Sequence, residues 1–247
     1  MGLRELATRL ILNNLHAQFP HADEQELYYQ LNVRCFGQKF AEQFFPTERT
    51  PFDGEKKMLN EVQIITMTAK RLDEAKIPYY LGGGVASINY GEPRLTNDAD
   101  FVIRIMPFHI PKLVKAFEQD FVISADAVQD ALNRRYAFNI IHIETAFKID
   151  FYPIADDEDM SIEAFSRRLP QDIGGGEIWM ASAEDVILAK LDWFRKGGKV
   201  SDKQWRDVLG VLKVQGERLD FAYLESMAGR FGLADLLERA RDDAGAV

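Results

Sequence analysis

The sequence lacks features that define whole classes of protein. Its 247 residues include one cysteine, Cys35, which excludes an internal disulfide framework and a cysteine-rich zinc site. Seventeen glycines and nine prolines, without a repeat, exclude a collagen-like or disordered chain. No run reaches the roughly 18–20 apolar residues of a membrane span, and the N-terminus lacks the apolar core of a signal peptide. We therefore expect a soluble, cytoplasmic globular protein that has no membrane partner.

The charge balance and the missing motifs narrow the function. Thirty Lys and Arg stand against 39 Asp and Glu, a net charge of −9, whereas generic binding to nucleic-acid phosphates needs a basic surface. A local basic groove is still open, and the excess of carboxylates suits a site that gathers divalent metal. The chain has no His-Glu-x-x-His helix, no Gly-x-Ser-x-Gly turn and no Gly-Lys-Ser/Thr ending of a P-loop.

Hydrophobic periodicity predicts an α+β fold, in which a small mixed β-sheet is flanked by helices. We expect an N-terminal helical segment over residues 1–50, a core over 51–180 and a C-terminal helical region over 181–247. Within these parts, strands are expected over 79–81, 98–105, 136–143 and 146–152, and helices over about 55–75, 85–90, 219–230 and 232–244. Ser182 and Ser201 are predicted to cap two further helices that Gly197 and Gly198 separate. The helical spacing of Trp193, Phe194 and Trp205 favours core positions over base stacking.

Two aspartates with a spacing of two residues are the sharpest local feature. In the predicted strand Asp98 and Asp100 share one face, roughly 7 Å apart along it. Like charges at this distance repel unless a cation lies between them, and Mg²⁺ prefers oxygen ligands of this kind. For an isolated Asp-x-Asp the better interpretation is an acidic turn before an ordinary strand, so the neighbouring residues have to favour a metal site.

Those neighbours favour a site for phosphate and metal. The run Gly82 to Gly84 lies between a predicted strand and helix, where backbone N–H groups can approach phosphate oxygens. Arg94 and Thr96 precede the aspartates in a turn, and Arg94 could contact a phosphate or pair with the aspartates. Asp150 lies on the polar side of another strand, and a third carboxylate would allow a two-metal site.

Residues 81–100, LGGGVASINYGEPRLTNDAD, resemble the signature of the nucleotidyltransferase superfamily, which has the DNA polymerase β-like fold. That signature is a hydrophobic residue, Gly, Gly or Ser, about a dozen residues, and then Asp-x-Asp or Asp-x-Glu. Gly83 and Gly84 match it, with 13 residues before Asp98. FKIDF, residues 147–151, looks like the strand that carries the third carboxylate of the superfamily. Gly82 and the helical N-terminal segment depart from the superfamily core.

The C-terminal part is similar to AbiEii-type and related bacterial nucleotidyltransferases. SAEDVILAK, residues 182–190, and WRDV, residues 205–208, match helices that carry a Lys and an Asp near the nucleotide, here Lys190 and Asp207. Lys190 also falls on an apolar stripe, so it either extends to solvent or directs its ammonium at a charged site. Asp207 could instead cap a helix or pair with a basic residue such as Arg206.

The resemblance implies a Mg²⁺- or Mn²⁺-dependent enzyme that transfers a nucleoside monophosphate from a nucleoside triphosphate to an acceptor hydroxyl. Its implied catalytic residues are Asp98, Asp100, Asp150, Lys190 and Asp207, of which the first three hold the metal. Its implied nucleotide-binding residues are Gly83, Gly84, Arg94, Thr96 and Lys190.

The acceptor is left open by the sequence. An AbiEii-like toxin would act on tRNA or protein and would have an antitoxin protein as a partner. The alternatives are a small-molecule transferase of the antibiotic-modifying type and a nucleotide-binding protein without catalysis. The third aspartate, Asp150, counts against the last alternative, because a binding protein has no need of it.

Overall fold

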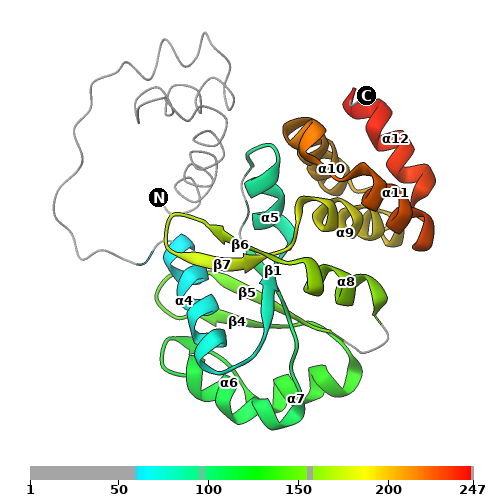
Figure 1. The fold of residues 1–247 in the computed structure, drawn as a ribbon. Helices are drawn as coiled ribbons and strands as arrows, with labels where there is room; N and C mark the ends of the chain where they lie inside the picture. Colours follow the sequence, from blue (N-terminus) through cyan, green and yellow to red (C-terminus); the bar gives the residue numbers. More distant parts are fainter. Residues whose placement is uncertain (1–58, 60, 95, 97, 155–157, 246–247) are drawn as a thin grey trace, which may run out of the picture.

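The computed structural model describes residues 59, 61–94, 96, 98–154 and 158–245 (Figure 1). The two helices expected within residues 1–50 therefore lie outside the described residues. The described secondary structure begins with helix α4, Glu61–Glu74, inside the range expected for the third helix.

A seven-stranded mixed sheet forms the centre of the fold. Its strands are β1 (Tyr79–Leu81), β2 (Asp98–Ile103), β3 (Phe121–Val122), β4 (Phe138–His142), β5 (Lys148–Pro153), β6 (Leu169–Asp172) and β7 (Glu177–Met180). They lie in the order β3-β4-β5-β2-β1-β7-β6. The pairs β2/β5 and β1/β7 are parallel, and the remaining neighbours are antiparallel. The four strands expected from the sequence are present.

Strands β2 and β5 each have one buried and one polar face, as their alternation predicts. In β2 the side chains of Ala99, Phe101 and Ile103 are fully buried. The ring of Phe151 in β5 contacts those of Phe101 and Phe117, with ring centroids 6.0 Å apart in each case. Burial of these aromatic side chains fixes the register of both strands, because a slip by one residue would place the aspartates in the core.

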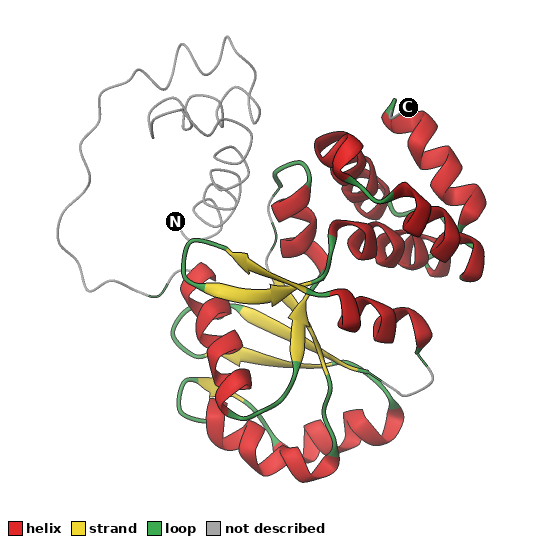
Figure 2. Cartoon of the chain, in the orientation of Figure 1, coloured by secondary structure: helices red, strands yellow, loops and turns green. Residues whose placement is uncertain are grey.

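Helices flank this sheet on several sides. The remaining α-helices are α5 (Gly83–Tyr90), α6 (Ile110–Phe117), α7 (Ala125–Arg134), α8 (Asp159–Arg167), α9 (Ala183–Lys196), α10 (Asp202–Gln215), α11 (Phe221–Arg230) and α12 (Ala234–Ala244). Helices α4, α6 and α7 gather at one side of the sheet, whereas α9 to α12 form a bundle beyond α5 and α8 (Figures 1 and 2). The α+β class with a mixed sheet and flanking helices is therefore confirmed.

The predicted caps of α9 and α10 are also confirmed. The Ser182 hydroxyl accepts a hydrogen bond from the Asp185 backbone N–H at 3.2 Å, and Ser201 accepts one from Gln204 at 3.4 Å. Each serine satisfies a donor that the first helical turn leaves without a partner. The turn that separates the two helices includes Gly198, which has a φ of +75°.

Several elements have no counterpart in the sequence-based prediction: α6, α7, α8, β3, β6 and β7. The strands among them have two to four residues and the helices eight to ten, and such short segments offer few repeats of a helical or strand period. The proposed boundary between the core and a C-terminal region at residue 181 stays a prediction. Within the described residues no helix has the length and apolarity needed to cross a membrane.

Candidate active site

The three predicted carboxylates lie on two neighbouring strands. Strands β2 and β5 run parallel, and in their register Asp100 is directly opposite Asp150, while Asp98 is opposite Lys148. Because β5 pairs with β2 rather than with β1, a residue 50 positions away in the chain is brought beside the Asp-x-Asp pair. Asp98, Asp100 and Asp150 thus share one face of the sheet.

The glycine run turns tightly against Asp100. The backbone N–H of Gly82 donates to the Asp100 carbonyl at 2.8 Å, and that of Gly84 donates to Asp100 Oδ2 at 3.1 Å. Gly83 has a φ of +54°, and a Cβ built on it would lie 1.7 Å from Asp100 Oδ2. The turn therefore requires glycine at position 83 for both backbone conformation and space.

Gly83→Ala is expected to disturb the site more than an equivalent change elsewhere. The new methyl group must displace the Asp100 carboxylate, in addition to the roughly 1 kcal/mol or more that alanine costs at positive φ. Gly198→Ala is the matched control, because Gly198 also has positive φ but a Cβ added there would meet nothing within 4 Å. Urea denaturation should show a larger loss of stability for Gly83→Ala. Equal losses in the two variants would mean that the contact with Asp100 does not matter.

Thr96 and Arg94 also lie beside this turn. A Cβ on Gly84 would be 2.7 Å from the Thr96 hydroxyl oxygen and 3.1 Å from an Arg94 guanidinium nitrogen. The Thr96 hydroxyl donates to Asp98 Oδ1 at 3.0 Å. The predicted residues Gly84, Arg94 and Thr96 are therefore close together around the start of α5.

Lys148 is a member of this cluster that the sequence did not single out. Its Nζ lies 2.6 Å from Asp150 Oδ2 and 3.7 Å from Asp98 Oδ2. The hydrogen bond to Asp150 raises the pKa of the Lys148 ammonium. The available signal was its place on the same face of β5 as Asp150, two residues before it.

Asp100 is partly buried within this cluster. Burial raises the pKa of its carboxyl group, and the neighbouring Asp98 and Asp150 carboxylates add to this effect. The N–H of Gly84 and the ammonium of Lys190 oppose it. The ionised form of Asp100 therefore gains from any additional cation in this position.

The donors of this cluster fit a hard divalent cation by their chemistry. Carboxylate oxygens are preferred ligands of Mg²⁺, and the Lys148 ammonium already places a positive charge against Asp98 and Asp150. In the part of the chain that the structure describes, no group of three His, Cys, Asp or Glu side chains converges as a formed metal centre. The carboxylates would therefore have to adjust around an ion.

Lys190 and Asp207 meet in a buried ion network with Arg94. Asp207 Oδ2 lies 2.8 Å from Lys190 Nζ, and its two oxygens accept hydrogen bonds from Arg94 Nε at 2.6 Å and Nη2 at 2.8 Å. Burial by itself raises the pKa of the Asp207 carboxyl group, but the two cations outweigh this and the pKa is lowered. The basic partners of Asp207 are thus Arg94 and Lys190, where the sequence had suggested its neighbour Arg206.

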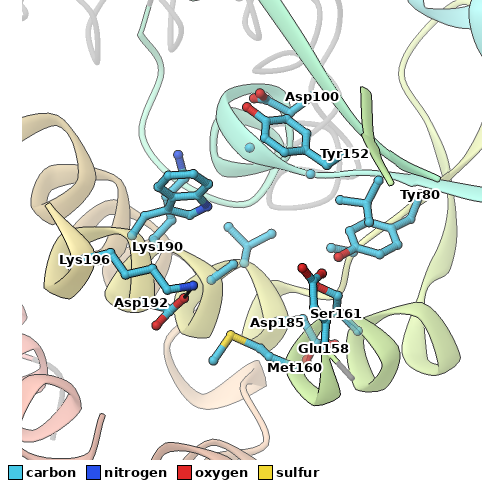
Figure 3. A pocket seen from close by; sticks show the side chains of 18 of the residues that line it. Tyr80, Asp100, Tyr152, Glu158, Met160, Ser161, Asp185, Lys190, Asp192 and Lys196 are labelled. Atoms are coloured by element: carbon cyan, nitrogen blue, oxygen red, sulfur yellow. Dashed lines mark ion pairs between the residues drawn. The ribbon is translucent and has the colours of Figure 1, made fainter. Parts of the chain in front are cut away.

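A cavity of about 820 Å³ opens beside Asp100. Its lining includes Asp100, Tyr152, Lys190, Trp193 and Gly83. Figure 3 shows Asp100 and Tyr152 along one side, Tyr80 of β1 at another, and side chains of α8 and α9 among the remaining lining. The volume is within the usual range of about 300–1,000 Å³ for small-molecule sites.

The expectation of a core position is wrong for Trp193. Its side chain is 55% exposed and lines the cavity, while its ring contacts that of Tyr152 edge-on at 6.4 Å. Phe194, the next residue of α9, is buried and packs on Trp205 with ring centroids 4.8 Å apart. Adjacent residues of a helix point in different directions, so helical spacing alone could not assign both rings to the core.

No model of a protein family matches this chain, and no curated protein sequence matches it significantly. Several solved structures are similar. A nucleotidyltransferase-like antigenic protein of Paracoccidioides brasiliensis is 19% identical, with 72% of this chain and 92% of that chain covered and a TM-score of 0.44. ANT(2")-Ia in complex with adenylyl-2"-tobramycin is 17% identical, with coverages of 69% and 98% and a TM-score of 0.48.

A third similar structure is the lincosamide antibiotic adenylyltransferase LnuA with bound lincomycin. It is 16% identical, with coverages of 64% of this chain and 99% of that chain and a TM-score of 0.43. These structural neighbours are nucleotidyltransferases or nucleotidyltransferase-like proteins. At such identities and TM-scores, no residue's role is transferred from them to this chain.

Proposed function

We propose that this protein is a metal-dependent nucleotidyltransferase. The acceptor hydroxyl oxygen would attack the α-phosphorus of a nucleoside triphosphate, and the bond to the leaving pyrophosphate would break. One observation carries the proposal: Asp98 and Asp100 share a strand face with Asp150 in register beside Asp100, and the glycine turn lies against Asp100 at a cavity. Carboxylate oxygens gathered on one face are the ligands that a hard divalent cation prefers.

Each residue of the cluster has a role in this proposal. Asp98, Asp100 and Asp150 would hold Mg²⁺ or Mn²⁺, which when bound would neutralise charge on the transferring phosphoryl group. Asp150 would either complete the metal site or accept the proton of the attacking hydroxyl. Gly83 and Gly84 allow the triphosphate to approach the N-terminus of α5. Lys190, which Asp207 holds in place, supplies positive potential next to Asp100.

The cavity favours a small-molecule acceptor. A volume of about 820 Å³ with exposed aromatic surface at Trp193 is suited to a compact organic molecule beside the nucleotide. The net charge of −9 argues against a large nucleic-acid interface. An AbiEii-like toxin that acts on tRNA or protein, with an antitoxin partner, is the second candidate. It is supported by the match of Lys190 and Asp207 to the pattern of those enzymes.

The test is transfer of label from each α-³²P nucleoside triphosphate in the presence of Mg²⁺. Three acceptor pools are offered separately: total RNA, total protein and a small-molecule fraction that includes aminoglycosides and lincosamides. The double variant Asp98→Ala/Asp100→Ala is the catalytic control, and its fold is checked by circular dichroism. We expect label in the small-molecule pool for the wild-type protein and none for the double variant.

The distribution of label separates the candidates. Label in RNA or protein that depends on the aspartates would favour the toxin-like enzyme over the small-molecule transferase. Nucleotide binding without transfer to any pool would point to a binding protein. If nucleotide does not bind at all, the proposal is rejected.

A further inference from the structure

Lys148 contacts two of the three carboxylates to which we assign the metal. Its ammonium is 2.6 Å from Asp150 Oδ2 and 3.7 Å from Asp98 Oδ2, so it bridges β5 and β2. At 2.6 Å it uses a lone pair of an oxygen that a metal would need. A divalent cation on the same oxygens would also repel the ammonium strongly at such short range. The two cations therefore compete for one position.

The exposure of the lysine side chain allows it to leave. The Lys148 side chain is 40% exposed, whereas the Asp150 side chain is 13% exposed. A lysine ammonium is a point charge on a flexible four-carbon stem, so it can move to solvent while its partner carboxylate stays in place. The Lys190 ammonium lacks this freedom to move to solvent, because its side chain is 7% exposed and its ion pair with Asp207 is enclosed.

We propose that Lys148 is an exchangeable counter-cation of this site: it neutralises Asp98 and Asp150 in the metal-free protein, and a divalent metal displaces it. This inference rests on the proposed function, since it assumes that the carboxylates bind metal. Lys148 is a positioning residue in the metal-free state. Once displaced, its ammonium is free to face the anionic triphosphate.

The direct test is Mn²⁺ binding to the full chain without nucleotide, measured from the electron paramagnetic resonance signal of free Mn²⁺. Lys148→Met removes the competing charge and keeps the length of the side chain. It should bind Mn²⁺ about tenfold more tightly, the fold-change expected when one hydrogen bond to a charged group no longer competes. Lys148→Arg keeps the charge and should bind no more tightly than wild type.

A matched control is Lys70→Met, which changes the same residue type in the exposed pair of Lys70 with Glu74 on α4. Its Mn²⁺ affinity should equal that of wild type. Thermal unfolding gives a second readout: in EDTA, Lys148→Met should unfold a few degrees below wild type, because it leaves carboxylates without their cation. Added Mn²⁺ should then raise its melting temperature by more than it raises that of wild type.

The outcomes distinguish this inference from the proposed function. If Lys148→Met folds and binds Mn²⁺ no more tightly than wild type, the proposal that metal displaces Lys148 is rejected, even when the aspartates bind metal. If the methionine variant fails to fold, the Mn²⁺ affinity of Lys148→Gln is compared with that of wild type in the same way. If Asp98→Asn/Asp100→Asn binds Mn²⁺ as well as wild type does, or no protein in the series binds it, both proposals are overturned.

Discussion

Asp100→Asn is expected to abolish nucleotidyl transfer. Asparagine keeps the shape of the side chain and an acceptor for the Gly84 N–H, but it removes the negative charge that would hold the metal. Metal stabilisation of phosphoryl charge supplies several kcal/mol, so we expect kcat/KM to fall by about a thousandfold or more. Steady-state transfer assays at saturating Mg²⁺ measure this loss.

The same substitution should stabilise the metal-free fold at neutral pH. Because burial raises the pKa of Asp100, its ionised form is disfavoured in the folded protein, and the stability of wild type falls as the pH rises through that raised pKa. The neutral asparagine carries no such cost, so we expect a gain of about 0.5–2 kcal/mol at pH 7 in EDTA. The gain should disappear below the ordinary pKa of an aspartate, where the wild-type carboxyl group is protonated in both states.

Asp130→Asn is the matched control for Asp100→Asn. Asp130 pairs with Arg134 on the surface of α7, with a side chain that is 57% exposed. Its substitution should change stability by no more than about 0.5 kcal/mol and leave transfer intact. An Asp100→Asn protein that transfers nucleotide at the wild-type rate would remove Asp100 from the metal site. An Asp100→Asn protein that is less stable than wild type would show that the fold stabilises the negative charge of Asp100 without metal.

Asp207→Ala is expected to be the most destabilising of the substitutions considered. Asp207 has a side chain that is 4% exposed, and it pairs with both Arg94 and Lys190. Its removal takes this carboxylate away from both cations, and loss of one partner of a buried ion pair costs about 3–5 kcal/mol. Urea denaturation monitored by circular dichroism should show this loss.

Two further variants test the cause of that loss. Asp130→Ala breaks an exposed pair of the same type and should cost less than about 1 kcal/mol. The double variant Asp207→Ala/Lys190→Met should be more stable than Asp207→Ala alone, because it removes one of the two buried cations with which Asp207 is paired. If Asp207→Ala is as mild as Asp130→Ala, the network of Arg94, Lys190 and Asp207 does not support the fold.

The local parts of the site could be predicted from the sequence because their geometry is set by short-range rules. Period-2 alternation in β2 determines that Asp98 and Asp100 share a face, and the glycine run determines a tight turn at the start of α5. Ser182 and Ser201 determine where α9 and α10 begin, since each accepts a backbone N–H of the first turn.

Only the tertiary structure decided which of these parts meet. The order of the strands places β5 next to β2, which brings Asp150 beside Asp100 and Lys148 between Asp98 and Asp150. The contact of Arg94 with Asp207 joins residues 113 positions apart. Charged side chains on two separate elements can pair with many partners, and the packing of the apolar faces beneath them selects one. For this reason the sequence alone indicated the chemistry of the aspartates, but not that Lys148 contacts two of them or that Arg94 pairs with Asp207.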